Sequence, residues 1–177
     1  MLQGGCRLLQ LRCKGWADED VLAAGRVLQV ACRDLGATFL LNDRADLAVA
    51  LDADGVHVGQ LDAQTAAVRA ALGPDRILGR STNRADQIEE AVVGADYIAF
   101  GPVFATQNIS RVKEVQGLAL LAAAREATDL PLVGIGGISA QTLPAVWATG
   151  ADAWAVIGAI ASAADRVDAT RALVRAP

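Results

Sequence analysis

The strongest constraint on this fold is a regular alternation, along the whole chain, of short aliphatic runs and longer stretches rich in Ala and Leu. The short runs predict strands at residues 7–11, 38–41, 55–57, 77–79, 97–100, 132–135 and 153–156. The stretches between them predict helices at residues 18–35, 43–51, 62–72, 84–93, 117–128 and 140–149, with a last helix near 166–174. Strand, helix and strand repeated in this order indicate parallel pairing through crossover helices.

A weak internal repeat narrows the architecture. Residues 53–59, 94–101 and 150–156 share one plan, in which an Ala-Asp pair precedes an apolar strand. Gly94 and Gly150 stand where a helix needs a left-handed residue in order to end. Such turns recur around a barrel, so the predicted fold class is α/β, a (β/α)8 TIM barrel formed as a single domain by the whole chain.

The number of predicted strands is one short of a closed barrel. The chain has 177 residues, below the roughly 200 that are usual as a lower limit for that fold. Residues 1–5 resemble the tail of a preceding helix, so we expect the first strand to be missing through an N-terminal truncation. The first visible strand and the last would then have unpaired edges, which favours self-association into a homo-oligomer. The alternative is a doubly wound open sheet, whose phosphate loop usually follows its first strand.

Charge and hydropathy exclude several classes of partner. The net charge of −4 comes from 16 basic and 20 acidic residues dispersed along the chain, so no basic stripe predicts binding of nucleic acid or an acidic membrane surface. No apolar run reaches the roughly 18 residues that a membrane span needs, and the N-terminus lacks the layout of a signal peptide. We therefore expect a soluble cytoplasmic protein.

The three cysteines are Cys6, Cys13 and Cys32, and no Cys-x-x-Cys spacing occurs. This pattern supports neither a disulfide framework nor a structural zinc site. Cys13 could act as a nucleophile, but a small structural cysteine is the more common case.

Function in a parallel barrel gathers where the strands end and the following loops begin. Arg12 and Lys14 follow the first predicted strand and alternate, so both side chains can face the mouth of the barrel. Only Lys14 and Lys113 are lysines among the 16 basic residues. An arginine beside a lysine at this position predicts two cations that grip a phosphorylated group. The alternative is a solvated strand end.

Two aspartates follow consecutive strands. Asp43 and Asp62 can converge over the mouth, and two carboxylates with phosphate oxygens and water make a typical Mg2+ site. Alternatively both are helix N-caps, a position that Asp favours strongly. A simple ion pair between Asp43 and Arg44 is a further alternative.

Glycines follow the last two strands. The segment from Gly134 to Ser139, which contains Gly136 and Gly137, ends a strand and opens a helix, where backbone N–H groups can approach a phosphate. Ile157 and Gly158 follow the last strand. The two loops match the phosphate cup of such barrels, although Gly also serves plain turns. His57, the single histidine, has no evident partner and is interpreted as a packed or hydrogen-bonded structural residue.

In their order and spacing these segments resemble the thiamine phosphate synthase/TenI family from about residue 4 to residue 163. The most specific motifs are Gln10-Leu11-Arg12-x-Lys14, Asn42-Asp43-Arg44-x-Asp46-Leu47-Ala48, Asp54-Gly55-Val56-His57-Val58-Gly59-Gln60-x-Asp62, Gly94-Ala95-Asp96-Tyr97 and Gly101-Pro102-Val103-Phe104. The family's synthase joins 4-amino-2-methyl-5-hydroxymethylpyrimidine diphosphate to a thiazole phosphate and releases pyrophosphate, with Mg2+ as its cofactor. The resemblance therefore implies a transferase of thiamine biosynthesis with small phosphorylated pyrimidine and thiazole substrates.

The resemblance also implies individual roles. Arg12, Lys14 and Ser81 would be the catalytic residues, Asp43 and Asp62 would bind Mg2+, and the substrate-binding residues would be Gln10, Asn42, Thr106, Gly136, Gly137, Ile157 and Gly158. The family usually has Thr-x-Thr-Lys after Gly-Pro-x-Phe, whereas Ile109 stands here in place of the Lys, with Arg111 or Lys113 as substitutes from the same loop. Asn83 stands where the family often has His.

Two other functions fit the same residues. One is a TenI-type isomerase that tautomerises a thiazole phosphate, which predicts degraded pyrimidine and magnesium residues and a proton shuttle that Asn83 does not offer. The other is a non-catalytic relative that still binds phosphate, which the replacement by Ile109 favours.

Overall fold

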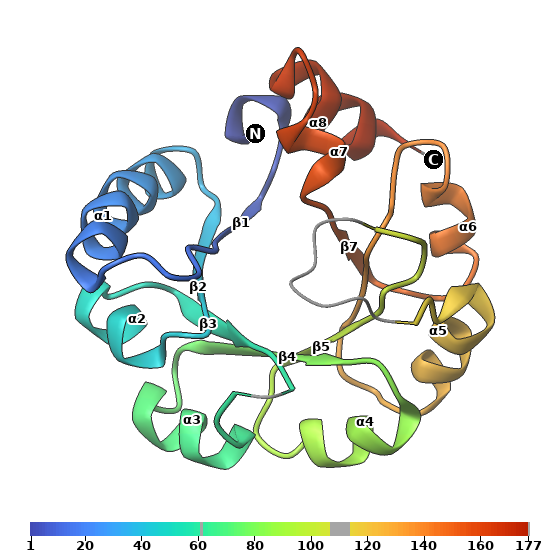
Figure 1. Ribbon diagram of the computed structural model, residues 1–177, viewed down its shortest axis with the longest axis horizontal. Helices are drawn as coiled ribbons and strands as arrows, with labels where there is room; N and C mark the ends of the chain where they lie inside the picture. Colours follow the sequence, from blue (N-terminus) through green and yellow to red (C-terminus); the bar gives the residue numbers. More distant parts are fainter. Residues whose placement is uncertain (61, 107–113, 177) are drawn as a thin grey trace.

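The strands form one curled sheet in which every strand is parallel to its neighbours (Figure 1). The computed structural model describes residues 1–60, 62–106 and 114–176. In these ranges the sheet has seven strands in sequential order. They are β1 (Leu8–Leu11), β2 (Thr38–Asn42), β3 (Gly55–Val58), β4 (Ile77–Thr82), β5 (Tyr97–Phe100), β6 (Leu132–Ile135) and β7 (Ala153–Ala155). The prediction of a barrel of the TIM type is confirmed, and that of an open doubly wound sheet is excluded by the sequential strand order.

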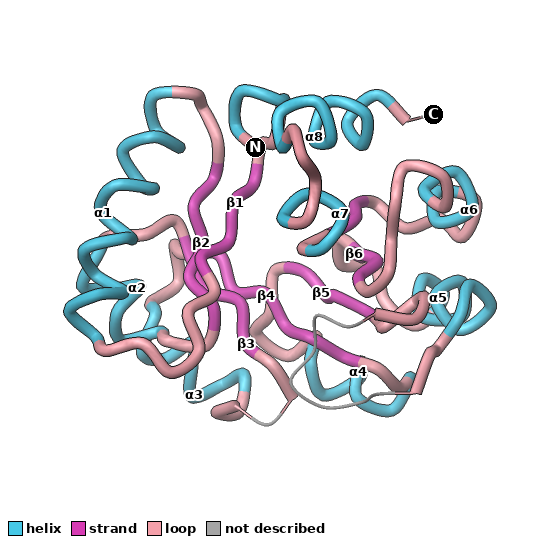
Figure 2. The backbone as a smooth tube through the Cα atoms, turned by 45° about the horizontal axis from the view of Figure 1, so that its top comes forward, coloured by secondary structure: helices cyan, strands magenta, loops and turns pink. Residues whose placement is uncertain are grey.

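Helices surround the outside of the sheet (Figure 2). They are α1 (Asp18–Asp34), α2 (Ala45–Leu51), α3 (Thr65–Leu72), α4 (Ala85–Ala91), α5 (Gly117–Glu126), α6 (Leu143–Trp147), α7 (Gly158–Ala161) and α8 (Arg166–Arg175), preceded by a short 3-10 turn, η1 (Leu2–Gly4). The sequence did not predict α7, because four residues are too few to show a helical period. None of the helices in the described ranges has the length and apolarity required to cross a bilayer.

The core lies between the strands and the helices. Successive side chains of a strand point to opposite faces, so one set of residues packs outward and the other lines the interior of the barrel. Phe39, Val56 and Leu78 are fully buried in one outer cluster, and Ile98 and Leu132 in a second. The opposite parity, which includes Asn42, His57 and Tyr97, faces the interior.

The repeated Ala-Asp pair explains how the strands are joined at their amino ends. Asp54, Asp96 and Asp152 accept a backbone N–H bond from Phe39, Leu78 and Leu132 respectively, at 2.7, 2.7 and 2.8 Å. Each aspartate thus ties the start of an odd-numbered strand to the strand before it. The internal repeat is therefore a structural device repeated once for every two strands.

The sheet does not close. In the described ranges no strand pairs with the outer edge of β1 or of β7, as expected for a barrel with one strand fewer than eight. Both views place η1 beside α8 at this opening (Figures 1 and 2). Gly4 permits the contact, because a Cβ atom there would lie 2.6 Å from Cβ of Thr170.

Candidate active site

The loops that carry the predicted site residues lie at one face of the molecule. Because all the strands are parallel, their carboxyl ends meet at the same end of the barrel. Arg12 and Lys14 follow β1, Asp43 follows β2, Asp62 follows β3 and Gly137 follows β6. The loop order around the barrel is the strand order.

Asp43 has a conformation that aims its side chain at the first loop. Its φ of 67° is left-handed, and its backbone N–H donates to the carbonyl of His57 at 2.8 Å. The carboxylate forms an ion pair with Lys14, with 3.0 Å between Nζ and Oδ2. Helix α2 begins after Asp43, and the residue at its N-cap is Arg44. The alternative that Asp43 is a helix N-cap is therefore wrong.

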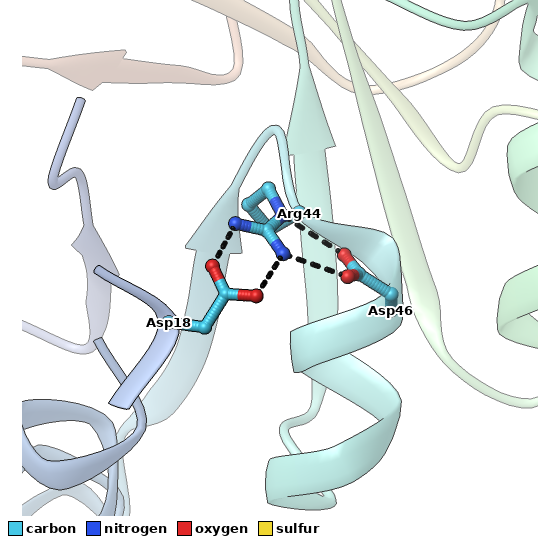
Figure 3. A network of polar contacts seen from close by, with 3 residues as sticks. All are labelled: Asp18, Arg44 and Asp46. Carbon is cyan, nitrogen blue, oxygen red and sulfur yellow. Dashed lines mark hydrogen bonds and ion pairs between the residues drawn. The ribbon is translucent and has the colours of Figure 1, made fainter. Parts of the chain in front are cut away.

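The alternative pairing of Asp43 with Arg44 is also not what forms. The Arg44 guanidinium donates instead to both carboxylate oxygens of Asp18, at 2.6 and 2.9 Å, and to both of Asp46, at 3.1 and 2.8 Å (Figure 3). This network links the start of α1 to the start of α2. Asp43 is left with Lys14 as its ionic partner.

Asp62 approaches Asp43 from the next loop. Its Oδ2 accepts the N–H of Gly59 at 2.5 Å, which folds the loop after β3 back on itself. Helix α3 has Gln64 at its N-cap, so Asp62 is not a helix cap either. Burial raises the pKa of the Asp62 carboxyl, and the hydrogen bond and negative charge of Asp43 raise it further, whereas Gly59 and Lys14 lower it. Two carboxyl groups thus share one site beside one ammonium group.

This donor set fits a divalent cation of the hard type. Adjacent carboxylates repel each other, and a cation between them removes that cost. Among the residues that the structure describes, no cluster of three or more His, Cys, Asp or Glu side chains could hold a metal. Asp43 and Asp62 could hold Mg2+ only as a pair, with its other ligands from phosphate oxygens and water, as proteins often bind this ion.

Three of the residues predicted to bind substrate have polar side chains without a partner inside the described part of the protein. Within the described ranges the side chains of Gln10, Arg12 and Asn42 form no hydrogen bond or ion pair, so they can bind a substrate without first breaking an internal contact. A pocket of about 250 Å³ lies at the ends of β1 and β2, and of these three residues Asn42 lines it. Lys14, Asn42 and Asp43 line it together with Trp16, whose side chain the sequence did not single out.

His57 and Ser81 are joined in the interior of the barrel. The Nε2 atom of His57 lies 2.8 Å from Oγ of Ser81, and its Nδ1 atom lies 2.7 Å from the hydroxyl of Tyr97. Burial lowers the pKa of His57 to about 4, with the charge of Asp43 opposing that shift and Arg80 adding to it, so the ring is neutral at pH 7. His57 is a buried, hydrogen-bonded histidine, as predicted, and its partners are Ser81 and Tyr97.

Two further residues that the sequence analysis named, Asn83 and Cys13, have contacts or surroundings that bear on their expected roles. Asn83 accepts a hydrogen bond from Nε2 of Gln60 at 2.9 Å and thereby ties the loop after β4 to the loop after β3. Burial raises the pKa of the Cys13 thiol, which keeps it protonated, the opposite of what a nucleophile needs.

The glycine loop after β6 packs closely against the loop after β5. Gly136 and Gly137 have left-handed φ values of 96° and 66°. A Cβ atom on Gly136 would lie 2.6 Å from Cα of Pro102, and one on Gly137 would lie 2.5 Å from the carbonyl oxygen of Ala105. Close packing of two loops therefore requires these glycines, whatever they bind. Ile157 and Gly158 follow the neighbouring strand β7, and Gly158 begins α7.

Thr106 belongs to the same loop after β5. Ile109, Arg111 and Lys113, on which the predicted departure from the family pattern rests, lie outside the described residues.

The fold and the site together define a class: a parallel (β/α) barrel with a polar site where the strands end. The sequence profile of the family described as thiamine monophosphate synthase matches residues 1–160. A thiamine-phosphate synthase from Laribacter hongkongensis is 46% identical over 172 residues, which cover 97% of this chain and 82% of the relative. One from Moorella thermoacetica is 43% identical over 173 residues, with the same coverage of both chains.

A solved structure agrees. Thiamine phosphate pyrophosphorylase from Pyrococcus furiosus superimposes with a TM-score of 0.91 at 35% identity, over 98% of this chain and 84% of that one. The chain belongs to the thiamine monophosphate synthase family.

Proposed function

We propose that this chain is a transferase that joins 4-amino-2-methyl-5-hydroxymethylpyrimidine diphosphate to a thiazole phosphate, releasing pyrophosphate and making thiamine phosphate. The observation that carries the proposal is the cluster of Lys14, Asp43 and Asp62. These side chains come from three different loops and meet at the mouth of the barrel. One cation and two carboxylates in contact suit a diphosphate that arrives with its own divalent ion.

The diphosphate would be held by groups of complementary charge. Asp43 and Asp62 would bind Mg2+, which when bound neutralises the negative charge that builds on the departing pyrophosphate. Arg12 and Lys14 would add fixed positive charge on the same group, and Ser81 a hydroxyl donor. Such charges lower the barrier because they are in place before the bond breaks.

The amide groups and the glycine loops would bind the remaining parts of the substrates. Gln10 and Asn42, whose side chains have no internal partner in the described ranges, would hold the pyrimidine. The thiazole phosphate would lie at the ends of β6 and β7, close to the loop after β5. The residues that would bind it are Thr106, Gly136, Gly137, Ile157 and Gly158. Backbone N–H groups at such turns are the usual phosphate site of a parallel barrel.

The set of charged groups at the mouth of the barrel favours the synthase over the tautomerase. A tautomerase has no diphosphate to bind and hence no use for Arg12, Lys14 and the carboxylate pair. Here Lys14 and Asp43 are already joined in an ion pair in the absence of substrate.

Binding and turnover measured on the same chain test this function. We expect a rise in melting temperature with pyrophosphate plus Mg2+, a separate rise with thiazole phosphate, and release of pyrophosphate when both substrates are supplied. A response to thiazole phosphate alone, without pyrophosphate release, would indicate the tautomerase. A response to neither ligand would reject the proposed function and leave a family member without this activity.

A further inference from the structure

The contact between His57 and Ser81 is built by three neighbouring strands. His57 of β3, Gly79 of β4 and Tyr97 of β5 stand side by side in the sheet register. Ser81 lies two residues beyond Gly79 and so points to the same face, nearer the mouth. The imidazole of His57, only 6% exposed, bridges the Tyr97 hydroxyl on one side and the Ser81 hydroxyl on the other.

Gly79 makes this bridge possible. A Cβ atom there would lie 2.1 Å from Cζ of Tyr97 and 2.3 Å from its hydroxyl oxygen. The Tyr97 ring therefore crosses over Gly79 to reach the imidazole, with 5.4 Å between the ring centroids and 29° between the ring planes. The sheet leaves a space of one side chain so that two residues on non-adjacent strands can touch.

The number of protons on the imidazole determines which group donates in each of the two hydrogen bonds of His57. A neutral imidazole has one N–H donor and one acceptor nitrogen. In the described ranges the Tyr97 hydroxyl has no hydrogen-bond partner besides Nδ1 of His57, so its proton has an acceptor within the protein only if Tyr97 donates to Nδ1. The imidazole proton then belongs on Nε2, which donates to Oγ of Ser81.

This arrangement leaves the Ser81 proton without an acceptor on His57. Ser81 is partly exposed at the mouth, and in the described ranges its side chain has no other hydrogen-bond partner. We propose that His57 is a positioning residue, which Tyr97 holds in the Nε2–H tautomer. Because Nε2–H then donates to Oγ of Ser81, the Ser81 hydroxyl donates its own hydrogen bond outward, to a phosphate oxygen of the pyrimidine substrate. The proposal deepens the proposed synthase function and rests on it for the identity of the ligand.

The tautomer can be observed directly, because the chain contains one histidine. In tag-free protein labelled with 15N-histidine, long-range proton–nitrogen NMR spectra would report one imidazole. We expect a protonated Nε2 and an unprotonated Nδ1 at pH 7. A protonated Nδ1 would overturn the proposal, whatever reaction the chain catalyses.

Two substitutions at one position separate the proposed role from simple packing. His57→Gln keeps an N–H donor at the position of Nε2, whereas His57→Asn keeps a polar group at the position of Nδ1 and cannot reach Ser81. With pyrophosphate plus Mg2+ as the titrant, we expect Ser81→Ala and His57→Asn each to weaken binding about 10-fold, the effect of one hydrogen bond to a charged group. His57→Gln should stay within about threefold of the parent chain.

The double variant provides the decisive comparison. If His57 acts through Ser81, adding His57→Asn to Ser81→Ala causes no further loss of pyrophosphate binding. Independent losses that multiply would overturn the proposal, as would equal binding by His57→Asn and His57→Gln. Tyr97→Phe removes the hydroxyl that fixes the His57 tautomer and alters no group at the mouth, so it should weaken pyrophosphate binding several-fold. It replaces His57→Asn if that variant does not fold. Unchanged pyrophosphate binding in Tyr97→Phe would overturn the proposal.

The same measurements distinguish a failure of the positioning role of His57 from a failure of the proposed synthase function. If Ser81→Ala binds pyrophosphate as the parent chain does and the parent chain turns over, the positioning role fails while the synthase stands. If the parent chain neither binds pyrophosphate nor turns over, the proposed function fails, and only the NMR result on the tautomer retains its meaning.

Discussion

The two ends of the barrel use aspartate in opposite ways. At the amino ends of the strands, Asp54, Asp96 and Asp152 each accept a backbone hydrogen bond, and the last two also pair with arginines, Arg69 and Arg125, at 2.6 Å. At the carboxyl ends, two carboxylates face each other beside a single lysine. The amino-end carboxylates lie apart from one another, each with its own partners, whereas the carboxyl-end pair shares one lysine.

This difference indicates that aspartates at the amino ends of the strands stabilise the fold, whereas those at the carboxyl ends serve the chemistry of the site. A carboxylate that accepts hydrogen bonds from the chain's own N–H groups stabilises the folded state. Two carboxylates in contact destabilise the folded state until a cation joins them, which is the usual signature of a functional site. Substitutions at the two ends should therefore have opposite effects on stability and on activity.

The largest expected effect is on turnover at the carboxyl end. Asp43→Asn, which suits the left-handed φ of that residue better than Ala would, should lower magnesium-dependent turnover by at least about 100-fold, the scale of one lost electrostatic contact in a transition state. The melting temperature should not fall. Asp46→Asn on the same face is the matched control and should retain activity. Full activity in Asp43→Asn would refute the metal assignment.

A second effect concerns the dependence of stability on pH. Burial lowers the pKa of His57 from 6.5 to about 4, so between these values the unfolded chain binds a proton that the folded chain does not. Stability from this group is therefore lost as pH falls from about 6.5 to 4, by up to about 3 kcal/mol. Urea unfolding at several pH values would show a flatter profile for His57→Gln. Identical profiles in the two chains would contradict the buried neutral imidazole.

A third effect is the loss of stability at the amino end. Asp96→Ala removes the acceptor for the N–H of Leu78 and the partner of Arg69, and should lower the free energy of unfolding by about 2 kcal/mol. Turnover per folded molecule should not change, since the residue lies at the end of the barrel opposite the candidate site. A selective loss of turnover in a stably folded Asp96→Ala chain would break the division of roles between the two ends.

The smallest expected effect has the opposite sign. Asp62→Asn removes one of two adjacent negative charges and keeps an acceptor for the N–H of Gly59, so without Mg2+ it should stabilise the fold by about 1 kcal/mol, the interaction of two unit charges about 4 Å apart in water. Calorimetry in the presence of a chelator measures this. Destabilisation by Asp62→Asn would mean that the carboxylates do not repel each other in the folded chain.

Local patterns were enough to predict the strands, the helices other than α7, and the loops that carry the candidate site. Short apolar runs, the glycines at helix ends and the Ala-Asp pairs each act over a few residues, so they can be recognised without a structure. Capping could not be judged in this way: Asp43 and Asp62 belong to a residue type that favours N-caps, yet α2 and α3 begin at later residues. Asp43 pairs with Lys14, and Asp62 accepts the N–H of Gly59, in place of capping a helix.

What the sequence by itself determined is the order of strands and helices and, through parallel pairing, the end of the barrel at which the charged loops gather. The tertiary structure alone decided which side chains touch there: Lys14 with Asp43 rather than Arg44 with Asp43, Asp62 beside Asp43, and His57 between Ser81 and Tyr97. The physical reason is register. A contact between residues 24 or 40 positions apart, as for His57 with Ser81 and Tyr97, depends on how neighbouring strands align, and a shift of one residue would turn each side chain to the other face.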